Sequence, residues 1–166
     1  IATQPAFQAV KGIHGSILFT LSMPVSRLHL LAVRVSIGWL ETAALVVFFC
    51  CGIWLLSPAA AVPGMELLEY AGTLTACAST IYFVSVLLAT FLEEQWRIWG
   101  TMMAVGVLWW ASRHAGLPAF ADIFRAMGKN SPLTAHAMPW DAMGFSLGLS
   151  AVLFFAALKI VQMREY

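Results

Sequence analysis

Glu41 is the residue whose position most strongly suggests chemistry, because it is an acid well inside a long apolar run, Val35 to Leu56. An ionisable group within a membrane-spanning segment indicates a functional site by default, since a charge is costly to bury in hydrocarbon. The alternative is a structural acid near the membrane surface, close to water or paired with a neighbouring helix. Proton relays need several such groups, and the other apolar runs offer none. We therefore favour the structural interpretation.

A second candidate is the pair Glu93-Glu94, followed by Arg97. Two carboxylates can serve as a general base and a metal ligand when a dry pocket supplies their partners. Intramembrane proteases of the glutamate type use a double Glu with an Arg a few residues later and histidines on later helices. Here the Arg is one residue closer than in that motif, and no apolar run contains a well-placed His. We interpret the segment 93–97 as a solvated turn between two helices.

The remaining residues with metal-binding or nucleophilic chemistry are scattered along the chain: Cys50, Cys51, Cys77, His14, His29, His114 and His136. The cysteines all lie in apolar runs, which is typical of packing residues, and no spacing of Cys and His suits a metal site. The sequence has neither a G-x-S-x-G motif nor a Gly-rich phosphate loop. We expect this chain to have no catalytic site and to bind no metal or cofactor.

The composition places these residues in a membrane. Hydrophobic residues make up 61% of the chain and charged residues 10%, whereas a soluble domain has about 45–50% and about 25%. A chain of 166 residues has room for one domain, and its net charge of +1 does not point to a nucleic-acid partner. Because the apolar residues form runs long enough to cross a bilayer, we predict an all-α integral membrane protein with about four transmembrane helices.

The predicted spans cover four segments, at about 35–56, 70–92, 97–114 and 142–163. The first would be about 33 Å long, enough for a hydrocarbon core of about 30 Å. The third is the weakest, because its apolar part is short. In the second, Gly72, Ala76 and Thr80 are spaced four apart, which gives a stripe where another helix can approach closely.

A different kind of helix is expected in the connection before the last span. After Pro118, four apolar residues recur at helical spacing: Phe120, Ile123, Phe124 and Met127. This pattern predicts an outer helix over about 118–128 that lies in the membrane interface, with a packed surface loop as the alternative. Asp141 is the predicted N-cap of the last span. The small residues Gly144 and Gly148 suit helix packing, within the chain in preference to a dimer.

Lysine and arginine counts set the orientation, because cytoplasmic loops are enriched in both. If residues 1–34 are cytoplasmic, six cations lie inside: Lys11, Arg27, Arg34, Arg97, Lys159 and Arg164. Three lie outside: Arg113, Arg125 and Lys129. This excess places both chain ends in the cytoplasm. We expect a multi-pass protein of the cell membrane, the inner membrane of a bacterium.

The segment before the first span contains the most informative motif. Pro24 suits the first turn of a short cytoplasmic helix, in which Ser26, Arg27 and His29 can meet water or another protein. A short helix joined directly to a span can transmit rigid-body motion from a cytoplasmic partner into the membrane. An interfacial anchor that only positions the span is the alternative.

The run Thr20-Leu21-Ser22-Met23-Pro24-Val25-Ser26-Arg27 resembles a segment of the permease subunits of type-2 ABC exporters. That segment reads Leu or Met, then Pro-Val/Ile-Ser-Arg, then a leucine-rich start of the next helix. In these permeases the segment begins with Gly and then Thr or Ser, and a Glu usually stands shortly before that Gly; residues 12–14 here contain no Glu. These permeases have six spans, an outer helical segment before the last span, and cytoplasmic ends. Our four spans match the last four, and because Ile1 is not an initiator Met, we expect a missing front portion.

The resemblance implies the C-terminal four-span portion of an exporter permease. Pro24, Val25, Ser26 and Arg27 would lie in a cytoplasmic coupling helix that contacts a separate ATP-binding ABC subunit. That subunit would hold ATP and Mg²⁺, and a second permease copy or a paralogue would complete the translocation path in the lipid bilayer. A non-transporting scaffold or assembly subunit is the alternative, and a glutamate-type intramembrane protease is a less favoured one.

Overall fold

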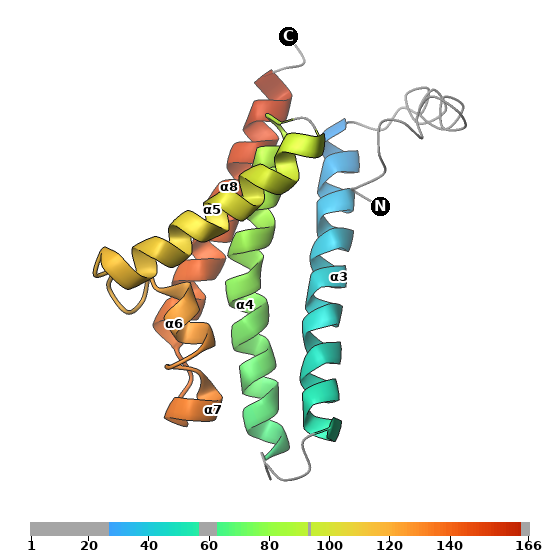
Figure 1. Ribbon diagram of the computed structural model, residues 1–166. Coiled ribbons are helices and arrows are strands. Elements are labelled where there is room, and N and C mark those ends of the chain that lie inside the picture. Colours follow the sequence, from blue (N-terminus) through green and yellow to red (C-terminus); the bar gives the residue numbers. More distant parts are fainter. Residues whose placement is uncertain (1–26, 57–62, 93, 164–166) are drawn as a thin grey trace.

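The computed structural model describes residues 27–56, 63–92 and 94–163, and it is helical without strands over these ranges (Figure 1). The helices are α3 (Arg27–Leu56), α4 (Gly64–Ala89), α5 (Glu94–His114), α6 (Ile123–Met127), α7 (Pro132–Ala135) and α8 (Trp140–Met163). The prediction of an all-α fold is confirmed for this part of the chain.

Three helices are long and apolar enough to cross a membrane: His29–Leu56 within α3, Gly64–Ala89 and Trp140–Met163. They support a multi-pass membrane protein. Helix α5 forms where the third span was predicted, but its mean hydropathy is lowered by polar residues at both ends, so it is not among the candidate spans. A fourth crossing stays a prediction.

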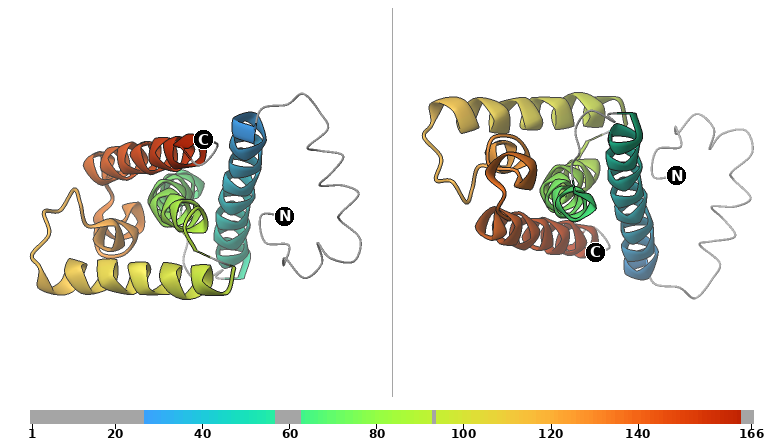
Figure 2. Two further views of the ribbon diagram at one scale, coloured as in Figure 1. Left: turned by 90° about the horizontal axis from the view of Figure 1, so that it is seen from above. Right: turned by 90° about the horizontal axis from the view of Figure 1, so that it is seen from below.

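Helix α4 lies at the centre of the bundle. It packs against α3 on one side, α8 on another, and α5, α6 and α7 on the rest, as the two end-on views in Figure 2 show. Its buried residues are small or of moderate size: Ala71, Thr73, Ala76, Cys77, Ser79 and Thr80. Small side chains let neighbouring helices approach closely, and in lipid this packing replaces the hydrophobic force that drives helix association in water.

The contact between α4 and α8 combines small residues with hydroxyl groups. Ser146 donates to the carbonyl oxygen of Ala76 over 2.7 Å, and the Thr80 and Ser146 hydroxyls are hydrogen-bonded to each other. The predicted stripe is therefore confirmed at Ala76 and Thr80. Gly72 is exposed, so the prediction of a close helix approach is wrong at that residue.

Helix α8 packs internally through Ala142, Ser146, Ser150 and Ala157, which are all buried. The two glycines expected to mediate this packing, Gly144 and Gly148, lie on an exposed side of the helix, where a Cβ on either would have nothing within 4 Å. Packing within the chain through small residues is thus found, but on another side of α8 than the side that carries the two glycines. Asp141, the predicted N-cap, falls instead within the first turn of α8, two positions after the N-cap position, because the helix already begins at Trp140.

Two hydrogen bonds join α3 to α4 near the start of α3. The indole nitrogen of Trp39 donates to the Ser79 hydroxyl over 2.7 Å, and the Tyr82 hydroxyl donates to the carbonyl oxygen of Val35 over 2.9 Å. Since few donors are available in hydrocarbon, such bonds fix the rotation of one helix against the other.

Helices α6 and α7 are packed into the bundle. Ile123 and Ala126 of α6 form a buried cluster with Cys77 of α4 and Ala142 of α8. The outer helix was expected over about 118–128, lying in the membrane interface, whereas α6 has 5 residues and its apolar side faces protein. Asp122 starts it later than expected, because its side chain caps the helix at that point.

Candidate functional site

The predicted coupling residues lie at the edge of the described structure. Pro24, Val25 and Ser26 fall outside the described residues, and Arg27 is the first residue of α3. The segment from Arg27 through Arg34 to Val35 is one continuous helix, although the span was expected to begin only at Val35. The apolar boundary at Arg34 therefore does not interrupt the helix.

Glu41 lies on α3 and is exposed. It is near the middle of the 28-residue candidate span His29–Leu56, deeper than the apolar run alone indicated. The structure brings it near the Tyr82 side chain of α4.

Glu93 lies outside the described residues. Glu94 is the first residue of α5, which also contains Arg97, so the prediction of a turn over 93–97 is wrong from Glu94 onward. Within residues 27–56, 63–92 and 94–163, no three His, Cys, Asp or Glu side chains come together in a way that could hold a metal ion.

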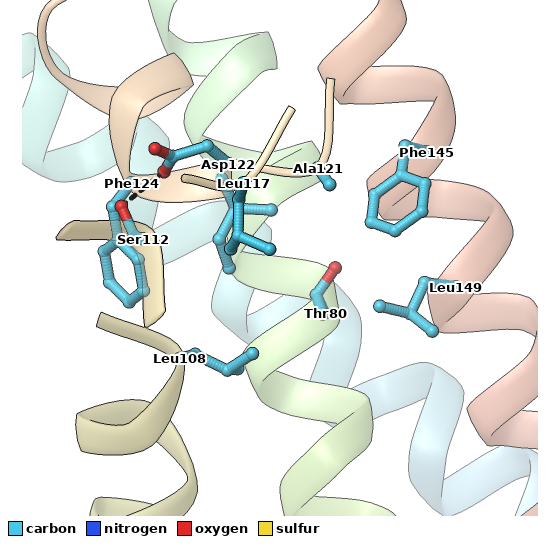
Figure 3. Close-up of a pocket in the computed structure, with 10 residues that line it drawn as sticks. Thr80, Leu108, Ser112, Leu117, Ala121, Asp122, Phe124, Phe145 and Leu149 are labelled. Atoms are coloured by element: carbon cyan, nitrogen blue, oxygen red, sulfur yellow. Dashed lines mark hydrogen bonds between the residues drawn. The ribbon is translucent and has the colours of Figure 1, made fainter. Parts of the chain in front are cut away.

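A cavity that sequence reasoning missed lies between α4, α5, α6 and α8 (Figure 3). Its volume is about 180 Å³. Its walls are mostly apolar, from Leu108, Leu117, Phe124, Phe145 and Leu149 together with Ala121 and Ile123, and three polar residues complete them: Thr80, Ser112 and Asp122. Such a lining suits an apolar group more than a charged one.

Asp122 is the buried carboxylate beside this cavity, with 6% of its surface exposed. Its Oδ1 accepts one hydrogen bond from the Ser112 hydroxyl over 2.7 Å and another from the backbone N–H of Arg125 over 2.9 Å. Figure 3 shows the carboxyl turned toward Ser112, away from Phe145 and Leu149 across the cavity. The geometry therefore assigns Asp122 to capping α6 and fastening it to α5.

A signal for this cap was present in the sequence, because Asp at the start of an amphipathic pattern is a preferred N-cap. The partner Ser112 carried no such signal. The two residues meet because the chain turns back between α5 and α6, where Gly116 has a φ of 61°.

In comparisons with known proteins, no family, no curated protein and no solved structure matches this chain. Fold and site together define its class: a small helical protein with three candidate membrane spans.

Proposed function

We propose that this chain is the membrane-spanning permease subunit of an ATP-driven exporter of the type-2 ABC class, with ATP and Mg²⁺ bound by a separate ATPase subunit. The motif from Thr20 to Arg27 motivates the proposal. The observation that carries it is the helical continuity after the motif: Arg27, its last residue, is also the first residue of the 30-residue helix α3.

This continuity supports a mechanical role. A partner that pushes on residues 24–27 acts directly on the end of α3, because no hinge separates the motif's last residue from the helix. The bonds from Trp39 to Ser79 and from Tyr82 to Val35 lie near that same end and tie α3 to α4. Since α4 contacts every other described helix, a tilt of α3 would pass into the whole bundle.

The direction of the helices also supports the proposed topology. The start of α3 and the end of α8 lie at one end of the bundle, while the α6–α7 region lies beside the other half of α4 (Figure 1). His136, which follows α7, lies 3.5 Å from Glu66 near the start of α4, in agreement with this placement. Helices α4 and α8 run in the same direction, so α5 returns the chain between them. A tilted α5 would supply the fourth crossing.

In the proposed orientation, the end of the bundle with Arg27 and the C-terminal end of α8 faces the cytoplasm, in the inner membrane of a bacterium. The α6–α7 region then corresponds to the outer helical segment of such permeases. A second permease copy or a paralogue would complete the translocation path.

The alternative is a non-transporting scaffold or assembly subunit, which needs packing faces but no ATPase. A glutamate-type protease is less favoured, because Glu94 is the first residue of α5, directly after the turn that ends α4.

The test is affinity isolation of the full-length protein from its native host in a mild detergent, with partners identified by mass spectrometry. We expect a stoichiometric ATPase with a phosphate-binding loop, and we expect Arg27→Glu to weaken its association without preventing membrane insertion. Arg125→Glu is the matched control, because Arg125 is an exposed cation on α6. Isolation without any ATPase would favour the scaffold, and unchanged association of Arg27→Glu would remove Arg27 from the contact.

A further inference from the structure

One side of α3 is turned away from the rest of the bundle. Its residues, here called the Glu41 face, are all exposed: Ile37, Glu41, Ala44, Leu45 and Phe48. At 3.6 residues per turn, they lie about 160° around the helix from Val35, Trp39 and Cys50, which are turned toward α4. In a membrane an apolar face of this kind is covered by lipid and needs no other partner. A carboxylate at the centre of such a face does need a partner, because lipid tails offer it no hydrogen bond and no opposite charge.

Glu41 lies too deep for its carboxylate to reach water by extending the side chain along the helix. Arg34 is exposed on the same side of α3, two helical turns nearer the cytoplasmic end in the proposed orientation, about 10 Å away along the axis. A glutamate side chain is too short to cross that distance, unlike the long side chains of Lys and Arg that reach the headgroups from inside a span. When α3 crosses the membrane as proposed, Glu41 lies within the hydrocarbon region, near the middle of the candidate span His29–Leu56.

The described helices give Glu41 no hydrogen-bond donor and no cation at contact distance. Tyr82 lies near Glu41, but the single hydroxyl proton of Tyr82 is already donated to the carbonyl oxygen of Val35. Ionisable residues within spans pair with each other or line polar paths. Glu41 therefore has an unmet requirement for a positive or proton-donating group that must come from outside these helices.

A second copy of this chain is a poor source for that group. If two copies pair by a two-fold axis along the membrane normal, their α3 helices meet in parallel. Glu41 then faces Glu41 and Arg34 faces Arg34, so that like charges meet at equal depth. The complementary surface is instead an apolar helix with a cation at mid-depth.

We propose that the Glu41 face binds a transmembrane helix of a different polypeptide, and that this helix presents a lysine or arginine to Glu41. Ala44 leaves room for the backbone of that helix to approach, while Ile37 and Phe48 pack on either side of the ion pair. This interface is independent of the cytoplasmic contact at residues 24–27, so either can fail without the other.

The experiment uses the full chain in liposomes, with a fluorescent protein at its C-terminus as energy-transfer acceptor. The probes are dye-labelled polyleucine transmembrane helices that carry a single central Lys, a single central Glu, or Leu alone. We expect the Lys helix to associate at least 10-fold more tightly than the other two. Glu41→Leu should abolish that difference and Glu41→Gln should reduce it, whereas Phe155→Leu, an exposed substitution on α8, should leave it unchanged.

Equal association of the Lys and Leu helices would overturn the proposal, and so would a preference for Lys that persists in Glu41→Leu. A third measurement mixes two differently labelled copies of the chain without any probe. Self-association that is lost in Glu41→Leu would assign the face to a second copy and overturn the choice of a different polypeptide. Self-association that is absent, or that is insensitive to Glu41, agrees with the proposal.

Discussion

The Tyr82 hydroxyl of α4 reaches the backbone of α3 only because residue 38 is a glycine. Tyr82 donates to the carbonyl oxygen of Val35, and its ring and hydroxyl occupy the space where a side chain at position 38 would begin. A methyl group there would come within 3.2 Å of the ring carbon that bears the hydroxyl. The close approach of α3 to α4 thus depends on a missing side chain.

Gly38→Ala should therefore destabilise the protein, by about 1–2 kcal/mol, since Tyr82 must move and give up its hydrogen bond. Unfolding in mixed detergent micelles measures the change. Gly52→Ala on the same helix is the control, because nothing lies within 4 Å of the added methyl group, and it should be neutral or stabilising. Tyr82→Phe should make Gly38→Ala less harmful. A destabilisation by Gly52→Ala equal to that by Gly38→Ala would contradict this contact.

The hydroxyls of Thr80 and Ser146 should be coupled energetically across the α4–α8 contact. Each single substitution, Thr80→Val or Ser146→Ala, should cost about 0.6 kcal/mol and at most about 2, and the double substitution should cost less than their sum. Thr101→Val serves as control, because the Thr101 hydroxyl donates only to the carbonyl oxygen of Arg97 on its own helix. Strict additivity would show that the two hydroxyls do not act together.

Asp122 should contribute more to stability than an acid on an exposed helix start. Asp122→Ala removes the N-cap of α6 and the acceptor of the Ser112 hydroxyl, which should cost about 1–3 kcal/mol. Asp141→Ala, at an exposed acid in the first turn of α8, should cost well under about 1 kcal/mol. Thermal unfolding in detergent compares the two. Equal losses would mean that Asp122 does not fasten α6 to α5.

His136 ends α7 with a φ of 50°, a left-handed conformation that branched side chains disfavour. Its contact with Glu66 leaves most of the His136 side chain exposed, so we expect this contact to contribute at most about 1 kcal/mol. His136→Gly should thus change the stability little, because relief of the backbone offsets the lost contact. His136→Val should lower it by about 1–2 kcal/mol. Ala137→Val is the adjacent control, and a Gly variant as unstable as the Val variant would refute the backbone argument.

The sequence was sufficient to predict an all-helical fold and three of the helices that are long and apolar enough to cross a membrane, because apolar runs of span length have few other uses. It was less informative about helix ends. The first span was predicted to start at Val35, because Arg34 lies just before the apolar run. A helical backbone can include a charged residue, however, and α3 begins at Arg27. Apolar runs indicate where hydrocarbon begins, not where hydrogen bonding within the helix stops.

The candidate site could be predicted only in part. Glu41 stood out because an acid in an apolar run is visible in one dimension. The pairing of Asp122 with Ser112 depends on the path of the chain between α5 and α6, which no local pattern reveals. Likewise, Ser146 and not Gly144 faces α4, because the partner helix sets the rotation of α8 and its small residues occur on two sides.

The central claim, that an ATPase subunit contacts residues 24–27, is tested most directly by site-specific photo-cross-linking in native membranes. A photoreactive amino acid replaces Val25 in the full-length protein, and the same residue at Gly148, which is exposed on α8, serves as reference. We predict that position 25 cross-links to an ATP-binding subunit with a phosphate-binding loop and that position 148 does not. If position 25 cross-links only to lipid or to this chain itself, the proposed coupling contact is wrong.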